Sequence, residues 1–280
     1  MESRACSGSE EPEDVFGSSV FALFAELPPL VSTSSPSGIF TYRDVSVMTP
    51  STNNWQLQAH GVWRSALYMV DHIEILLISS YGDKERIRNS NVLELGAATG
   101  LPGIHVAKNF ASRLVTLSDY PDPAILETLR ANIRLNREVL SPQTTMRVVG
   151  HKWGDDAPRT LTPDNTRKDD VQLYDIIITA DVLWLSEEHH NLIRTLLSHI
   201  RRSDTSLVYI VVGLHTGRYP ITRFIQLAKN SGLVVRMLRE AYIANEVLFR
   251  DWATEREGET SAQRSLWVVE LVLGLSSDLL

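Results

Sequence analysis

Short apolar runs alternate with amphipathic stretches over most of the chain from residue 91 onward. The apolar runs are rich in β-branched residues and predict strands at 92–95, 114–117, 146–149, 174–179 and 207–212. Apolar residues at helical spacing predict helices between them, at 101–110, 123–136, 187–201 and 220–231. Since strands that alternate with helices form parallel sheets, the pattern predicts a doubly wound α/β fold with its ligand site at the carboxyl ends of the strands.

Both ends of the chain depart from this alternation. Residues 233–241 and 265–273 predict two strands without a comparable helix between them, so we expect an antiparallel edge. Nearer the N-terminus, the pattern predicts a short helix at 16–30, a strand at 39–48 and a helix docked on the sheet at 62–79. Residues 1–14 have the Ser-rich, acidic composition of a disordered tail. We therefore predict this tail, an N-terminal extension at 15–80 and a ligand-binding domain at 81–280.

Composition narrows the class of protein. No apolar run approaches the roughly 18 to 20 uncharged residues that a membrane span needs, and the N-terminus lacks the features of a secretory or transit signal. We therefore expect a cytoplasmic protein that does not enter a membrane. The only cysteine, Cys6, excludes cysteine-based zinc and iron–sulfur sites within the chain. The net charge of −7 disfavours nucleic acid as a partner and favours a basic protein or a small molecule.

A turn of small residues follows the first strand of the alternating region and leads into a helix. It reads Glu94-Leu95-Gly96-Ala97-Ala98-Thr99-Gly100-Leu101. A dinucleotide-binding turn would read Gly-x-Gly-x-x-Gly, but Ala98 takes the place of its second glycine, which lets the backbone approach a pyrophosphate. The Gly-Lys-Ser/Thr ending of a phosphate-binding loop is missing as well. The turn therefore indicates a nucleoside-type ligand without a pyrophosphate.

The next strand ends in an acid, Asp119, about twenty residues beyond this turn. A carboxylate at that place can accept both hydrogen bonds of a ribose diol. Asp119 alone could equally cap the following helix. The turn and the acid in this order are a more specific signal than either feature alone.

The stretch from Trp63 through Trp184 resembles the nicotinamide N-methyltransferase-like, seven-β-strand protein methyltransferases. Members carry a Trp upstream of the glycine turn, which Gly61-Val62-Trp63 matches, and a turn that commonly reads Glu-Leu-Gly-Ala-Gly-x-Gly-Leu. Ala98 departs from that pattern and adds one methyl group next to the ligand. The resemblance implies a class I methyltransferase fold: a Rossmann-like, mostly parallel seven-stranded sheet with an antiparallel C-terminal edge. It also implies S-adenosylmethionine as the cofactor.

The same resemblance assigns the residues that contact the cofactor. They are Trp63, Glu94, Gly96, Ala97, Ala98, Gly100, Asp119, Trp153 and Ala180. Three of them have a purely structural alternative: Trp63 and Trp153 are large side chains that are usually buried whatever their role, and Ala180 is a small residue at a strand end.

Asp181 and Trp184 are the candidate residues on the reactive side of the site. Methyl transfer from a sulfonium needs a neutral nucleophile in line with the S–CH₃ bond, so positioning and desolvation are the main tasks and no metal is required. Asp181 would orient the incoming amine, while Trp63 and Trp184 would exclude water from it. The alternative for Asp181 is a helix cap or a loop hydrogen bond.

Three classes of function stay open. The first is methylation of a protein lysine or N-terminal amine, and the resemblance suggests a translation factor such as elongation factor 1-alpha as the substrate. The second is small-molecule N-methylation, and the third is a binding module without catalysis, for which Ala98 is the only hint. A nucleobase substrate is disfavoured, because Val182 and Leu183 replace the two prolines typical of such enzymes. The run Glu187-Glu188-His189-His190 predicts a solvated helix start rather than a metal site.

Overall fold

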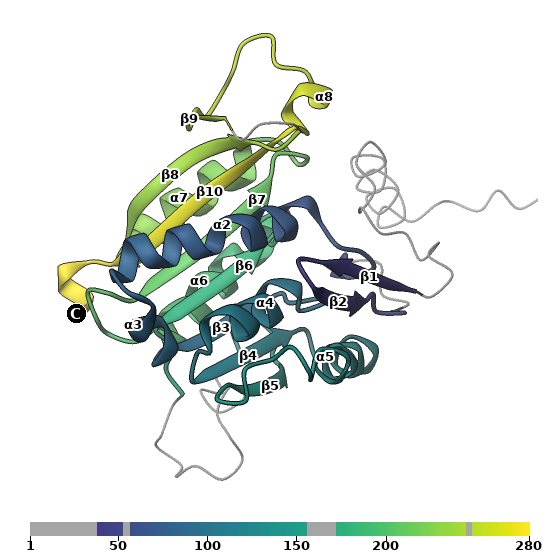
Figure 1. Ribbon diagram of the computed structural model, residues 1–280. Coiled ribbons are helices and arrows are strands. Elements are labelled where there is room, and N and C mark those ends of the chain that lie inside the picture. The colour runs from purple at the N-terminus through teal and green to yellow at the C-terminus, as the bar shows by residue number, and fades with distance from the viewer. Residues whose placement is uncertain (1–37, 53–56, 156–171, 245–247) are drawn as a thin grey trace, which may run out of the picture.

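The computed structural model describes residues 38–52, 57–155, 172–244 and 248–280 of the chain (Figure 1). The main sheet has eight strands in the order β5-β4-β3-β6-β7-β10-β8-β9. Their bounds are β3 (Asn91–Leu95), β4 (Leu114–Asp119), β5 (Thr145–Gly150), β6 (Ile176–Ala180), β7 (Leu207–Gly213), β8 (Leu233–Tyr242), β9 (Phe249–Asp251) and β10 (Trp267–Leu275). The first five strands in this order pair in parallel, while β10 pairs antiparallel with both β7 and β8. This arrangement confirms the mostly parallel sheet and its antiparallel C-terminal edge, to which β9 adds a short eighth strand.

Helices cover both faces of the sheet. On one face lie α2 (Arg64–Tyr81), α4 (Leu101–Phe110) and α5 (Pro123–Leu135), and on the other lie α6 (His189–His199) and α7 (Tyr219–Asn230). Shorter helices are α3 (Lys84–Arg88), η2 (Ser186–Glu188), α8 (Ser261–Arg264) and η3 (Ser277–Leu279). Figure 1 shows α2 lying along the sheet, as the spacing of apolar residues at 62–79 predicts.

The central strands are mostly apolar because both of their faces are covered, and the polar residues among them are buried as well. Every residue of β3 is buried. Val92 faces the core under α2 and α4, whereas its neighbour Leu93 faces the core under α6 and α7. Ile176 and Ile177 of β6 divide between the same two cores. The period-2 alternation of a strand thus builds two hydrophobic layers, which fix the sheet that carries the site.

Residues 39–48 form a hairpin, so the prediction of one strand over this range is wrong. The strands β1 (Ile39–Tyr42) and β2 (Val45–Met48) pair antiparallel in a two-stranded sheet of their own. Arg43 and Asp44 form the turn, both with positive φ (48° and 57°), which is the geometry of the tightest two-residue hairpin turns. The sequence hides this turn because it lacks the Asn-Gly or Asp-Gly pair that usually marks one.

Two predicted segments at the N-terminus, the tail at 1–14 and the helix at 16–30, lie outside the described residues. The division into an extension at 15–80 and a ligand-binding domain at 81–280 stays a prediction. Among the residues that the structure describes, no helix is both long and apolar enough to cross a membrane.

Candidate active site

A cavity of about 280 Å³ opens at the carboxyl ends of β3, β4 and β6. The strand order changes direction here, since β4 and β5 lie on one side of β3 while β6 and β7 lie on the other. Such a switch point is the place where open α/β sheets bind ligands. Ten of the eleven predicted site residues line the cavity. They are Trp63, Glu94, Gly96, Ala97, Ala98, Asp119, Trp153, Ala180, Asp181 and Trp184.

Gly100 is the predicted residue that does not line the cavity. It precedes α4 with a φ of 73°, a left-handed conformation that suits glycine. A Cβ atom at this position would lie 2.7 Å from Leu117 and 3.0 Å from Leu129, in the core behind the turn. Gly100 therefore shapes the turn from behind instead of facing a ligand.

Asp119 ends β4 with a buried carboxylate on the cavity wall. Its Oδ2 accepts a hydrogen bond from the backbone N–H of Ala98 (2.7 Å), and its Oδ1 accepts one from the N–H of Tyr120 (2.7 Å). Burial raises the pKa of Asp119 to about 6, although both hydrogen bonds oppose the rise. The following helix, α5, is capped by Asp122, so Asp119 does not serve as its cap.

Glu94 is a second buried carboxyl in the same wall. Its Oε2 accepts a hydrogen bond from the N–H of Gly103 in α4 (2.9 Å). Burial raises the pKa of Glu94 to about 8, and the nearby charge of Asp119 adds to this rise. Glu94 therefore holds its proton to a higher pH than Asp119 does, and in its protonated form it can offer a hydroxyl donor inside the cavity.

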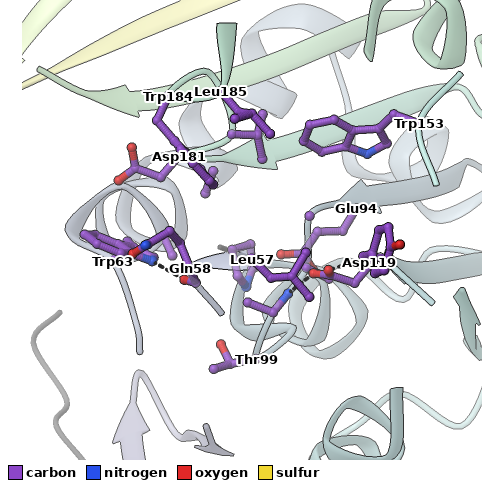
Figure 2. Close-up of a pocket in the computed structure, with 18 of the residues that line it drawn as sticks. Leu57, Gln58, Trp63, Glu94, Thr99, Asp119, Trp153, Asp181, Trp184 and Leu185 are labelled. Carbon is purple, nitrogen blue, oxygen red and sulfur yellow. Dashed lines mark hydrogen bonds between the residues drawn. The ribbon is translucent and has the colours of Figure 1, made fainter. Parts of the chain in front are cut away.

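Aromatic side chains stand at opposite ends of the cavity. Figure 2 shows Trp153 at the same end as Asp119, and Trp63 with Asp181 at the other end. Trp63 directly precedes α2, and its indole Nε1 donates a hydrogen bond to the carbonyl of Gln58 (2.9 Å). The cavity therefore has an end suited to a nucleoside and an end with a carboxylate beside an indole.

Asp181 follows β6 in a left-handed conformation, with a φ of 58°. Its Oδ2 accepts a hydrogen bond from Ser65 Oγ (2.8 Å), and its Oδ1 accepts one from the N–H of Gly213 (3.1 Å). The loop hydrogen bond considered as the alternative role of Asp181 is thus present. It does not exclude the functional role, because Asp181 lines the cavity as well.

Sequence reasoning missed several residues of the wall. Tyr120 and His151 directly follow β4 and β5, so the rule that ligands bind at strand ends could have found them. Leu57 and Gln58 lie in an irregular segment with no recognisable signal. The other residues of the wall are Gly61, Val62, Ala66, Thr99, Pro102, Lys152, Val182, Leu185 and Glu188.

The run from Glu187 to His190 is only partly the solvated helix start that its composition predicts. Glu187 and His190 are exposed, but His189 is buried, with its Nε2 3.0 Å from the carbonyl oxygen of Leu183. Glu188 lines the cavity. Within the described part of the chain, no group of His, Cys, Asp and Glu side chains could hold a metal ion.

Comparison with known proteins agrees with this geometry. The family model described as lysine methyltransferase matches residues 48–231. The chain is 30% identical to the protein N-terminal and lysine N-methyltransferase EFM7 of Gibberella zeae, over 65% of this chain and 69% of that protein. It is also 30% identical to the Emericella nidulans protein of the same name, over 76% of this chain and 81% of the other.

Among solved structures, the chain is similar to magnesium protoporphyrin IX methyltransferase from Synechocystis PCC 6803. The two are 14% identical with a TM-score of 0.49, over 94% of this chain and 97% of the other. At that level the structural likeness carries no argument about the family of this chain. The family follows from the family model and the two EFM7 relatives. The extent of the family match, from the end of β2 to the end of α7, covers every element that builds the cavity. The chain is therefore a methyltransferase that belongs to the lysine methyltransferase family.

Proposed function

We propose that this protein transfers a methyl group from S-adenosylmethionine to an amine of a protein, either a lysine side chain or an N-terminal amine. The observation that carries the proposal is the shape of one cavity. A buried acceptor, Asp119, stands at its nucleoside end, and Asp181 stands beside Trp63 at its other end. A cofactor that joins a nucleoside to a reactive sulfonium would extend from the first group to the second.

The residues present fit this cofactor. Asp119 keeps lone pairs beyond its two backbone hydrogen bonds and can accept both hydroxyls of a ribose diol. Trp153 offers an apolar face for the adenine at the same end. The Glu94 carboxyl and the backbone of Gly96 and Ala97 line the wall between the two ends, where the amino-acid part would bind.

The chemistry of the acceptor explains the other end of the cavity. When bound, S-adenosylmethionine supplies a methyl group on a positively charged sulfur. The acceptor amine must be neutral to attack it, and a lysine amine has an ordinary pKa of about 10.4, against about 7.7 to 8 for an N-terminal amine. Trp63, Asp181 and Trp184 all line the cavity. Burial beside the two tryptophans favours the neutral amine, and the carboxylate of Asp181 can accept its N–H and orient the lone pair.

The class of acceptor follows from the relatives, whose names describe N-terminal and lysine methylation. The net charge of −7 suits a basic protein segment as the partner. As the specific substrate we propose a translation factor such as elongation factor 1-alpha, which the resemblance in sequence suggests. A cytoplasmic location belongs to the same proposal, because such a substrate is found there.

Two measurements test the proposal. Thermal unfolding with S-adenosylmethionine should show stabilisation, of about 2.7 kcal/mol at 100 times the Kd, and Asp119→Ala should abolish it. Transfer of a radiolabelled methyl group should then mark the protein fraction of a cell extract, with the label on lysine or an N-terminal residue. No stabilisation at millimolar cofactor would contradict the cofactor assignment. Label confined to the RNA or small-molecule fraction would contradict the acceptor class.

A further inference from the structure

Asp181 lies close to a histidine from the turn that follows another strand of the sheet, β7. His215 follows β7, and its Nε2 lies 3.7 Å from Asp181 Oδ1. Both side chains are nearly fully buried, at 6% and 5% exposure. The distance is too long for a direct hydrogen bond but close enough for the imidazole to act on the charge of the carboxylate through a low-dielectric surrounding.

Gly213 makes room for this contact. A Cβ atom at Gly213 would lie 2.6 Å from His215 Nδ1 and 3.5 Å from Asp181 Oδ2. Any other residue at this position would therefore displace the imidazole. The backbone N–H of Gly213 also donates to Asp181 Oδ1 (3.1 Å), so the same residue holds the carboxylate and admits the histidine.

The imidazole of His215 also stacks on Trp63. The ring centroids are 5.5 Å apart and the planes are 18° from parallel. A small cavity of about 20 Å³ lies at this contact and shares Trp63 and Asp181 with the main cavity. Arg64 is the further charged side chain on its described wall. His215 thus touches both residues that form the acceptor end of the main cavity, although it does not itself line that cavity.

We propose that His215 is a positioning residue for the methyl acceptor, which acts through Asp181. This role rests on the proposed function, in which Asp181 contacts the acceptor amine. Ser65 Oγ approaches the Asp181 carboxylate from α2, while the Gly213 N–H and the His215 imidazole approach it from the end of β7 and the turn that follows. His215 helps to hold the orientation of the Asp181 carboxylate from the side of β7. Because its ring also stacks on Trp63, His215 fixes the position of the carboxylate relative to the indole.

Two substitutions at His215 distinguish the contribution of its stacked ring from that of its polar nitrogen. His215→Phe keeps a flat ring against Trp63 but removes the polar group that faces Asp181. His215→Gln keeps a polar nitrogen near Asp181 but removes the stacked ring. We expect His215→Phe to lower kcat about tenfold while the Kd for S-adenosylmethionine stays within about twofold, and His215→Gln to retain most of the wild-type kcat. His72→Phe, at a histidine that stacks on Tyr68 in the middle of α2, is the matched control and should leave both constants unchanged.

A double-mutant cycle tests whether His215 acts through Asp181. Once Asp181→Asn has removed the carboxylate's charge, adding His215→Phe should lower kcat no further, because the two residues form one unit. Gly213→Ala, which displaces the imidazole without removing it, should resemble His215→Phe. Equal losses in His215→Phe and His215→Gln, multiplicative losses in the double variant, or wild-type kcat in His215→Phe would each overturn the inference. Absence of methyl transfer in the wild-type protein would instead overturn the proposed function, so the two failures are distinguishable.

Discussion

Asp119 Oδ2 accepts a hydrogen bond of 2.7 Å from the backbone N–H of Ala98. This bond joins the end of β4 to the turn after β3, so the acid assigned to the ribose and the turn beside it hold each other in place. Both groups are turned toward the same cavity. The charge of Asp119 therefore affects the shape of the turn as well as its own contact with a ligand.

Cofactor affinity should fall in mild acid. Burial raises the pKa of Asp119 to about 6, above its ordinary value, so the carboxylate takes up a proton as the pH falls through about 6. A protonated carboxyl loses acceptor capacity toward the ribose diol and toward the N–H of Ala98. The Kd for S-adenosylmethionine should rise below about pH 6, approaching tenfold per pH unit when only the ionised form binds.

Calorimetric titrations from about pH 5 to about pH 8 would measure this dependence. Asp119→Asn is the control, because the amide cannot titrate: its affinity should be weaker and should not change over the same range. A wild-type Kd that is constant from pH 5 to pH 7 would show that the charge of Asp119 does not take part in binding.

Glu94 should make the folded state less stable as the pH rises. Its pKa is raised from an ordinary value of 4.5 to about 8 by burial, so the folded chain keeps a proton that the unfolded chain releases. Between these two values the free energy of unfolding should fall by up to about 1.4 kcal/mol per pH unit through this group. Glu94→Gln stays neutral and can still accept from Gly103, so its advantage over the wild type in urea unfolding should grow from about pH 5 to about pH 8. A constant difference would show that Glu94 ionises normally.

The part of the site that the sequence predicts is the part made by regular elements. Asp119 ends one apolar strand and Asp181 directly follows another, so their place at the carboxyl edge of the sheet can be predicted from the sequence. Gln58 and His215 lie in loops, and their positions depend on contacts with Trp63 that no local pattern encodes. The direction of the Asp181 carboxylate depends on Ser65, which is 116 residues away along the chain.

The hairpin shows the same limit at the level of the fold. Its strands alternate well enough to be recognised, but their turn and their docking site depend on tertiary contacts. Asn132 of α5 accepts from the N–H of Met48 (2.8 Å) and donates to its carbonyl (2.9 Å), and it also donates to the carbonyl of Thr99 in the turn after β3 (2.9 Å). Asn136, one helical turn later, forms the same pair of bonds with Ser46. The pattern of apolar residues does not predict these hydrogen bonds between the two asparagine side chains and the backbone of the hairpin.

Asn132→Ala should weaken both the fold and cofactor binding. It leaves the half-buried N–H and carbonyl of Met48 and the buried carbonyl of Thr99 without their partner, and we expect a loss of about 2 to 4 kcal/mol in the free energy of unfolding. Thr99 lines the cavity, so the Kd for S-adenosylmethionine should rise several-fold. Asn136→Ala is the matched control: it removes the equivalent bonds to Ser46 but does not reach the turn, so it should lower stability alone. Equal effects of the two variants on Kd would refute the coupling between hairpin and turn.

Ala98→Gly should improve cofactor binding. Ala98 has a φ of 45°, a left-handed conformation that costs an L-residue with a Cβ about 1 to 2 kcal/mol, and it lies on the cavity wall. Glycine adopts this conformation freely but loses about 0.5 to 1 kcal/mol through the greater entropy of the unfolded chain, so the net gain in stability should be about 1 kcal/mol or less. Ala111, with a φ of 51° at the end of α4, has the same strain without a place on the cavity wall. Ala111→Gly should therefore match the gain in stability and leave the Kd unchanged, whereas Ala98→Gly should also lower the Kd several-fold in calorimetric titration. Equal Kd values for the two variants would show that the methyl group of Ala98 does not restrict the cofactor.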